Sequence, residues 1–228
     1  ARAAFPLGPR MNLELLRAAL PDLLRAIGVT LGTWTAGVAG ALLLGFVIAL
    51  ARRYGPRWLG LLLQGYVELI RGTPFLIQLF LLYYGGPFIG LSLDPVPAGL
   101  LGLAAYGSAY FSEIFRAGFE AVPPGHVEAA ECLGMTRLQI VRRILLPEMV
   151  VLVLPPALNM AVVLLKETAV LSIITVPELT FQTSALGSQQ YAFVEALFIA
   201  ACFYWALVSL SGWLGRALER RLAHGAAT

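Results

Sequence analysis

The stretch EAAECLGMTRLQIVRRILLPEM, residues 128–149, carries three carboxylates and three arginines, whereas long apolar runs lie on both sides of it. Gly134 interrupts the stretch, and Pro147 lies near its end. Charged side chains are costly inside a hydrocarbon layer, so this segment belongs outside the apolar parts of the fold. A charged, interrupted segment between two apolar parts of a chain points to a contact with water or with another protein.

The composition excludes an ordinary soluble domain. Hydrophobic residues make up 59% of the 228 residues and charged residues 13%, and the mean hydropathy is +0.80. Soluble domains have about a quarter of their residues charged. The chain is therefore predicted to be an all-α integral membrane protein. Its net charge of +3 comes without a basic stripe interleaved with aromatic residues, so nucleic acid is not an expected partner.

Five apolar stretches approach or exceed the roughly 20 residues that a transmembrane helix needs. They cover residues 27–51, 58–84, 96–115, 149–174 and 191–214. We expect a transmembrane domain over residues 27–228, with a charged loop over residues 123–146. Gly32, Ala36 and Gly40 in the first stretch are small residues that suit close helix packing.

Residues 1–26 are expected to form a tail and a surface helix ahead of the first span. Leucines recur at helical spacing between charges in residues 11–27, which predicts an amphipathic helix. This helix either lies on the membrane surface or packs on the other helices. Residues 1–10 lack the apolar core of a signal peptide, and Met11 is an alternative start.

The distribution of arginines favours one orientation in the membrane. Four arginines precede the first span, and the loops around Asp94 and Glu178 on that side hold no Arg or Lys. Ten arginines lie in the loops and the tail on the other side: Arg52, Arg53, Arg57, Arg116, Arg137, Arg142, Arg143, Arg216, Arg220 and Arg221. This excess predicts an outside N-terminus and a cytoplasmic C-terminus, and it places residues 128–149 in the cytoplasm.

The charged stretch has the local signals of two short helices joined by a turn. Gly134 suits the left-handed position just past a helix end. Thr136 and Gln139 match a capping box that opens a second helix, and Pro147 suits the first turn of the next one. Met135, Leu138, Val141 and Leu145 are spaced along one face of the second helix, and the small side chains of Ala129 and Ala130 leave the first helix slim enough to enter a groove.

The stretch resembles a known motif. Glu128-Ala129-Ala130, Gly134, Ile144 and Leu146-Pro147 stand at the spacing EAA-x3-G-x9-I-x-LP, which is similar to the loop of the membrane subunits of binding-protein-dependent ABC importers. Further stretches resemble the polar amino acid branch of these permeases: ELIRGTPFLIQLFLLYYG, GSAYFSEIFRAGFEAVPPGHVEAAECLGM, PPALNMAVVLLKETAVLSIITVPEL and the C-terminal span.

The resemblance implies the type I importer fold with five spans per subunit. It implies a second permease subunit, identical or related, two cytoplasmic ABC ATPases and an extracytoplasmic amino acid-binding protein. The loop would be the coupling helix that contacts the ATPase, with Glu128, Ala129, Ala130, Gly134 and Arg137 as the coupling residues. The bacterial cytoplasmic membrane is the expected location.

The residues agree with a transport subunit that is not itself an enzyme. A phosphate-binding loop of the GxxxxGK[ST] kind needs a lysine, and the one lysine here, Lys166, follows no glycine at that spacing. ATP and magnesium would therefore be held by the partner ATPase, and no cofactor is expected on this chain. Cys132 and Cys202 lie in a polar loop and an apolar run, so neither a disulfide nor a metal site is expected.

Ionisable and polar side chains inside the spans are the candidates for the substrate path. Glu68 and Arg71 at i and i+3 are expected to neutralise each other, as are Glu113 and Arg116, with substrate contact as the alternative role. Pro155-Pro156 removes backbone donors inside the fourth span, as in the interrupted helices of transporter sites. The substrate path candidates are Glu113, Glu167, Lys166, Thr168, Asn159, Tyr110 and Ser108.

Three other functions compete with an amino acid importer. A type I permease for another small polar solute would differ only in its cargo. An intramembrane enzyme is disfavoured, because His126 and His224 both lie outside the spans. An ion channel or a passive scaffold would act without ATP.

Overall fold

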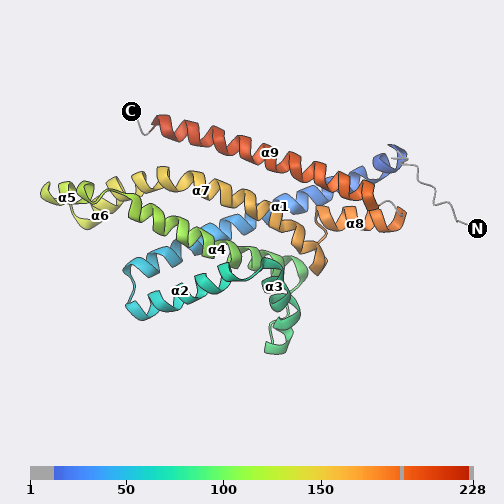
Figure 1. Cartoon of the computed structure of the whole chain (residues 1–228), viewed down its shortest axis with the longest axis horizontal. Coiled ribbons are helices and arrows are strands. Elements are labelled where there is room, and N and C mark those ends of the chain that lie inside the picture. The colour runs from blue at the N-terminus through green and yellow to red at the C-terminus, as the bar shows by residue number, and fades with distance from the viewer. Residues whose placement is uncertain (1–12, 191–192, 226–228) are drawn as a thin grey trace, which may run out of the picture.

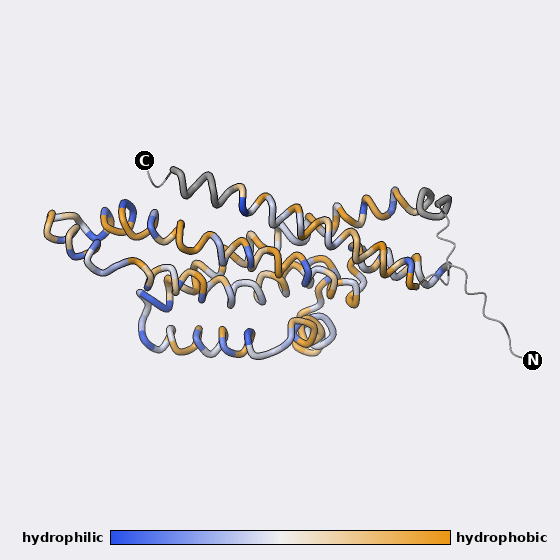
Figure 2. Tube along the Cα trace, turned by 45° about the horizontal axis from the view of Figure 1, so that its top comes forward, coloured by the Kyte–Doolittle hydropathy of each residue, from blue (hydrophilic) through white to orange (hydrophobic). Residues whose placement is uncertain are grey.

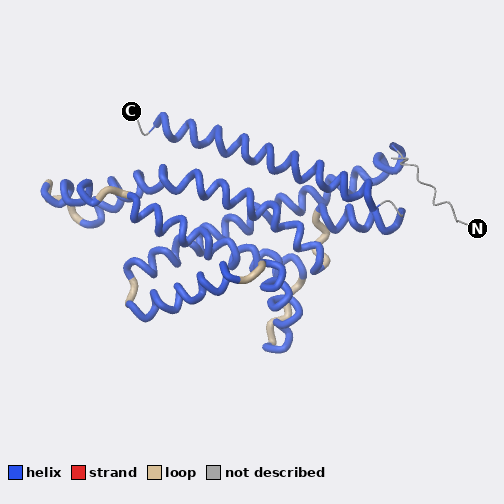
Figure 3. The backbone as a smooth tube through the Cα atoms, in the orientation of Figure 1, coloured by secondary structure: helices blue, strands red, loops and turns tan. Residues whose placement is uncertain are grey.

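The computed structural model describes the backbone of residues 13–190 and 193–225 and the side chains of residues 19–189 and 193–217. Within these ranges the backbone is helical almost throughout, with short loops and no strand (Figure 3). Four long helices run along the longest axis of the molecule (Figure 1): α1, Leu13–Tyr54; α4, Pro95–Ala121; α7, Leu146–Glu167; and α9, Phe193–Gly225.

Three helical stretches are long and apolar enough to cross a membrane, Ala19–Tyr54, Arg137–Ile174 and Phe193–Ala217, and a bent pair of helices forms a fourth. The remaining predicted span corresponds to α4, which packs against α1, α2 and α7. Its prolines, glycines, serines and tyrosines lower its hydropathy, but many of its residues are buried against these neighbours. Figure 2 shows hydrophobic residues along the middle of the bundle and hydrophilic residues mainly toward its ends.

α1 runs without a break across the predicted boundary at residues 26 and 27. Leu23 and Ala26 are 2% and 1% exposed, so part of the predicted surface helix packs on the protein. Leu20 and Leu24 are 44% and 58% exposed on the other side of the same turns, and their contact with lipid remains a prediction. Residues 1–12 of the predicted tail lie outside the described residues.

Small residues allow α1 and α4 to approach closely, although only one of the predicted positions takes part clearly. A Cβ on Gly45 would lie 2.7 Å from the Cβ of Phe111, and one on Gly107 would lie 2.7 Å from that of Ala41. A Cβ on Gly40 would lie 3.2 Å from that of Ala104, whereas a Cβ on Gly32 would have no such neighbour within 4 Å. The prediction that Gly32 serves helix packing is therefore wrong within this subunit.

The second predicted span is broken rather than straight. α2, Arg57–Gly72, meets the segment Phe75–Ile89 at an angle of 109°. This segment consists of α3, Phe75–Phe80, followed by a π turn and a 3-10 turn. Pro74 has no N–H to continue the helix. The side-chain amide of Gln78 donates to the carbonyls of Ile70 (2.7 Å) and Thr73 (3.0 Å), so the carbonyls freed at the break keep a donor.

The fourth span is interrupted at a different place from the one predicted. α7 continues through Pro155 and Pro156, and the helix tightens into a 3-10 turn, Thr168–Ile174, after Glu167. α8, Leu179–Gln190, then lies beside the start of α9. The remaining helices, α5 and α6, project beyond the bundle at the end opposite α8 (Figure 1).

Candidate functional site

The segment that projects from the bundle, residues 124–145, is called the projecting segment below. It begins with α5, Pro124–Cys132. Gly134 has a φ of +73°, in the left-handed region that glycine adopts without a steric penalty. Its N–H donates to the carbonyl of Glu131 (2.9 Å), and the N–H of Met135 donates to that of Ala130 (3.1 Å). These two bonds form a Schellman motif, so the chain turns at Gly134 for a local reason.

α6, Arg137–Ile140, begins at a complete capping box. The N–H of Thr136 donates to Oε1 of Gln139 (2.8 Å), and the N–H of Gln139 donates to Oγ1 of Thr136 (3.4 Å). This pair confirms the capping prediction. A π turn, Val141–Leu145, joins α6 directly to α7. The projecting segment is therefore attached to the bundle by continuous helical backbone.

The inner side of the projecting segment packs on the end of the bundle. Ala130, Ile140 and Leu145 are 2%, 4% and 8% exposed, and they belong to an apolar cluster with Phe119 and Met149. This apolar contact holds the projecting segment on the ends of α4 and α7.

The predicted inner face is only partly right. Leu138 is 60% exposed, whereas Ile140, which the spacing omits, is buried. The π turn after α6 adds a residue to one helical turn, so a spacing of three and four residues no longer follows a single face.

The outer side of the projecting segment is open. Glu128, Ala129 and Arg137 are exposed, as is Gly134. Of the five predicted coupling residues, Ala130 alone is buried: it faces the bundle and packs α5 against it. Leu133 was not predicted as a functional residue, but it is 81% exposed at the turn. Its exposure could have been predicted from its position directly before Gly134, because the residue before a helix-ending glycine lies at the tip of the turn.

A second contact ties α5 to α7. Nδ1 of His126 lies 2.9 Å from both carboxylate oxygens of Glu148, which is in the first turn of α7. With the apolar cluster, this contact gives the projecting segment two attachments to the bundle. A force applied to α5 would therefore reach α7 through the backbone and through this pair.

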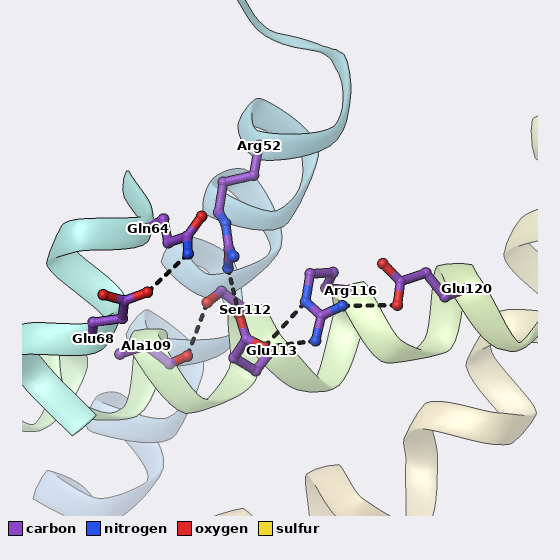
Figure 4. A network of polar contacts seen from close by, with 8 residues as sticks. All are labelled: Arg52, Gln64, Glu68, Ala109, Ser112, Glu113, Arg116 and Glu120. Carbon is purple, nitrogen blue, oxygen red and sulfur yellow. Dashed lines mark hydrogen bonds and ion pairs between the residues drawn. The ribbon is translucent and has the colours of Figure 1, made fainter. Parts of the chain in front are cut away.

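Ion pairs join α1 and α4 near the same end of the bundle (Figure 4). The Glu113 carboxylate accepts hydrogen bonds from Arg52 on α1 and from Nε and Nη2 of Arg116 (3.0 and 2.8 Å) on α4. Nη1 of Arg116 also donates to Glu120 (2.7 Å). The predicted pairing of Glu113 with Arg116 is confirmed, and Arg52 adds an interhelical partner.

The predicted pairing of Glu68 with Arg71 is wrong. The Glu68 carboxylate instead accepts from the side-chain amide of Gln64 (2.8 Å), which is one turn earlier on α2. The guanidinium of Arg71 lies 5.6 Å from the ring centroid of Tyr110 on α4. An i, i+3 spacing brings two side chains near each other, but each can still interact with a different residue.

A cavity of about 480 Å³ lies between the end of α2, α4 and α7. Arg71, Glu113 and Arg116 supply its charged wall, and Leu152 and Pro156 of α7 supply part of its apolar wall. A cavity with both a carboxylate and guanidinium groups can accept the ammonium and the carboxylate of a zwitterion. Pro156 thus borders a cavity, which fits the expectation that helix prolines in a span lie at a protein-lined space.

The other predicted path residues are dispersed along the bundle. Ser108 is buried and bonds to the hydroxyl of Tyr66 (2.9 Å), and Thr168 is buried and donates to the carbonyl of Leu165 (2.7 Å). Asn159 borders a separate cavity of about 410 Å³ between α7 and α9. Lys166 is exposed and Glu167 is half-buried, so these adjacent residues face different surroundings.

Comparisons with known proteins agree on one family. The family described as "Binding-protein-dependent transport system inner membrane component" matches residues 41–224. The chain is 32% identical to the probable amino-acid ABC transporter permease protein YckA of Bacillus subtilis, covering 93% of this chain and 94% of the relative. It is 31% identical to the arginine transport system permease protein ArtQ of the same organism, covering 89% of this chain and 93% of the relative.

Solved structures give the same result for the fold. An amino acid ABC transporter crystallised with histidines has a TM-score of 0.86 and 35% identity, covering 92% of this chain and 97% of that one. The MetNI methionine ABC transporter in an inward-facing conformation has a TM-score of 0.74 at 19% identity, covering 90% of this chain and 98% of that one. At that identity the second likeness concerns the fold alone.

Proposed function

Because the chain belongs to the family of inner membrane components of binding-protein-dependent transport systems, we propose that it is the permease subunit of an ATP-driven importer for polar amino acids. The single observation that carries the proposal is the projecting segment, with an open outer side and firm attachments to α4 and α7. The rest of the proposal concerns what that outer side touches and what the bundle carries.

The outer side of the projecting segment is the contact for a cytoplasmic ABC ATPase. Glu128 and Arg137 supply charge, while Ala129 and Leu133 supply small and apolar surface. Gly134 fixes the angle between α5 and α6, and Ala130 anchors α5 on the bundle. ATP and magnesium are held by the ATPase, and this chain binds neither as a cofactor.

The substrate path includes the cavity bordered by Arg71 and Glu113. Glu113 already accepts bonds from two arginines, so an incoming ammonium group competes with them. Glu167 is the second acceptor candidate, because it lies half-buried where α7 changes to a 3-10 turn. Ser108, Tyr110, Asn159, Lys166 and Thr168 lie elsewhere along the bundle and remain candidates for other parts of the path.

The protein spans the inner membrane several times, and we propose an outside N-terminus and a cytoplasmic C-terminus. The projecting segment, the turn after α1 and the end of α9 gather at one end of the bundle, and the start of α1 lies at the other (Figure 1). The arginine-rich loops therefore share one end, as the positive-inside rule requires of cytoplasmic loops.

The working assembly contains a second permease subunit, either another copy or a related chain, two ATPase subunits and an extracytoplasmic binding protein. Mass spectrometry of a complex purified by a tag on this chain tests this composition. The proposal expects an ABC ATPase and a permease in the complex. Recovery of this chain alone under conditions that preserve its fold would contradict the proposal and favour a channel or a scaffold.

Another small polar solute is the alternative cargo. To distinguish an amino acid cargo from another solute, uptake of radiolabelled arginine, glutamine and cystine is measured in proteoliposomes loaded with ATP. Other small polar solutes are added as competitors. An amino acid importer accumulates at least one of these only when ATP is present. Transport of a sugar or a peptide in their place would overturn the cargo but not the family.

A further inference from the structure

A third cavity, of about 510 Å³, lies where α1 ends and α2 begins. Arg52 and Arg53 of α1, Arg57 of α2 and Arg116 of α4 line it, and Glu120 is the only carboxylate among its described lining residues. The coupling and substrate roles proposed above do not use Arg53 or Arg57, and the positive-inside rule accounts only for the side of the membrane on which they lie.

Two of the four arginines are neutralised within the protein, and two are not. Arg52 and Arg116 both turn toward Glu113, and Arg116 also pairs with Glu120 (Figure 4). Among the residues whose side chains the structure describes, no carboxylate lies within ion-pair distance of Arg53 or Arg57. The cavity with Glu113 beneath it therefore carries an excess of two positive charges, from four arginines and two glutamates.

Arg53 is held in position without a counter-ion. Its Nε donates to the hydroxyl of Tyr54 (3.2 Å), and its guanidinium lies 5.3 Å from the ring centroid of Phe119. Arg53 is exposed, so its guanidinium stays accessible to an anion beside these two neighbours, and its planar fork suits phosphate oxygens.

The backbone at the cavity adds to the positive potential. Arg57 is the first residue of α2, a helix of 16 residues whose N-cap, Pro56, makes no side-chain cap bond. The first turn of α2 holds no acidic side chain, so its free amides favour an anion. The turn before it is tight, because a Cβ on Gly55 would lie 2.3 Å from the carbonyl oxygen of Ala51.

The surroundings of the cavity are those of a membrane interface. Tyr54 and Trp58 are 61% and 63% exposed, and Leu61, which lines the cavity, is 70% exposed. Tyrosine and tryptophan are enriched at the headgroup level of membranes, and basic pockets on the cytoplasmic side bind anionic headgroups. An acyl chain can leave the cavity past Leu61 while the phosphate stays among the arginines.

We propose that this cavity binds the phosphate group of an anionic phospholipid such as phosphatidylglycerol, with Arg53 and Arg57 as its main ligands. The site joins the end of α1 to the start of α2, and α4 forms its third wall. A bound lipid would thus hold together the three helices that also surround Glu113. The proposal does not depend on transport or on the identity of the cargo.

The test measures lipid binding to the purified complex by native mass spectrometry, with phosphatidylglycerol and phosphatidylcholine offered separately. We expect wild-type protein to retain phosphatidylglycerol strongly, and the double variant Arg53→Gln/Arg57→Gln to bind it roughly thirtyfold more weakly. The matched control is Arg142→Gln/Arg143→Gln, which removes the same charge from exposed positions at the same end of the molecule. The control is expected to retain wild-type binding.

Two further measurements distinguish a specific lipid site from the alternatives. Arg53→Lys/Arg57→Lys keeps the charge, so partial binding supports a site that uses the guanidinium fork. Millimolar inorganic phosphate that displaces the lipid at Arg53 and Arg57 would assign the same site to free phosphate. Equal phosphatidylglycerol binding by wild type and Arg53→Gln/Arg57→Gln, or an equal loss in the control, would overturn the proposal. Retained ATPase and permease partners in each variant show that the assembly has folded.

Discussion

Gly134 is the residue whose conformation shapes the projecting segment. Its φ of +73° is strained for any residue with a Cβ, although no atom lies within 4 Å of where that Cβ would be. A substitution there therefore acts on backbone conformation alone. The sequence predicted this position correctly, because a glycine that ends a short helix before a capping box is a local signal.

Gly134→Ala is expected to destabilise the turn by about 1 kcal/mol, and Gly134→Asn by less, since asparagine tolerates the left-handed region. Amide hydrogen exchange of residues 129–139 measures this local stability. Gly125→Ala is the matched control, because Gly125 lies in α5, the helix that the Gly134 turn ends, with free space and no positive φ. Equal exchange rates in Gly134→Ala and Gly125→Ala would refute the role of the turn.

Glu113 joins α1 to α4 through bonds that the sequence predicted only in part. Arg116 is three residues away and could be predicted, whereas Arg52 is 61 residues away and could not. The side chains of Glu113 and Arg52 are 20% and 14% exposed, so water screens their interaction only weakly.

Replacing Glu113 by Gln is expected to lower the free energy of unfolding by ~2 kcal/mol, because it removes charged hydrogen bonds to two arginines. Thermal unfolding in detergent measures the loss, and Glu68→Gln, on an exposed side chain bound to Gln64, is the control. The double variant Arg52→Gln/Glu113→Gln should lose less than the sum of the two single variants. Strict additivity would contradict a direct pair.

At the scale of elements, the break between α2 and α3 shows the limit of sequence interpretation. Gly72 and Pro74 both disfavour a continuous helix, but the bend of 109° depends on contacts made elsewhere. Phe75 and Leu79 are 4% and 0% exposed in the core of the bundle, which turns α3 away from the axis of α2. Such tertiary contacts override a hydropathy pattern that favours one straight helix.

Gln78 is expected to stabilise this break by donating to two backbone carbonyls. Gln78→Leu keeps a similar volume and removes both donors, which should cost about 1–3 kcal/mol of stability. Ile77→Leu, at a position that is 46% exposed, is the control. If the melting temperature of Gln78→Leu in detergent equals that of the control, the side-chain amide does not hold the break.

α8 was not predicted because the contacts that place its start in the fold, with Thr30 and Tyr204, come from distant residues, although the carboxylate that caps it, Glu178, is local. Glu178 looked like a loop carboxylate, but it is fully buried and accepts from the N–H groups of Thr180 and Phe181 and from the hydroxyl of Tyr204. Burial raises the pKa of Glu178 above its ordinary value, and these hydrogen bonds act against that rise. The N–H of Leu179 donates to Oγ1 of Thr30, far away on α1.

At the scale of the whole molecule, the fold class and the projecting segment followed from the sequence, whereas the placement of the path residues did not. Helix caps and turns are decided within a few residues. Which cavity a side chain such as Asn159 or Glu113 borders depends on how long helices pack, and spacing along one helix does not contain that information.

The native cysteines test the orientation of the molecule. Cys132 is exposed on α5, and Cys202 is exposed on the apolar α9. In a Cys202→Ala background, a membrane-impermeant maleimide is expected to label Cys132 in inside-out vesicles and not in intact cells. Labelling in intact cells would place the projecting segment outside and reverse the orientation. Cys132→Ala in the same background controls for nonspecific reaction.

The projecting segment also predicts how transport depends on ATP hydrolysis. Charge reversal by Glu128→Lys, or a new charge introduced by Leu133→Glu, alters its outer side without touching the cavities or the packed inner side. Asp22→Lys reverses an exposed charge on the first turns of α1 and is the control, because the start of α1 lies at the other end of the bundle (Figure 1).

The most direct measurement is the number of amino acid molecules accumulated per ATP hydrolysed, in proteoliposomes that hold the complete complex. We predict that Glu128→Lys and Leu133→Glu lower this ratio at least about tenfold, as expected for a loss of roughly 1.4 kcal/mol of coupling free energy between the ATPase and the bundle, while Asp22→Lys leaves it unchanged. An unchanged ratio in both variants of the projecting segment would contradict the claim that this segment transmits the motion of the ATPase to the bundle.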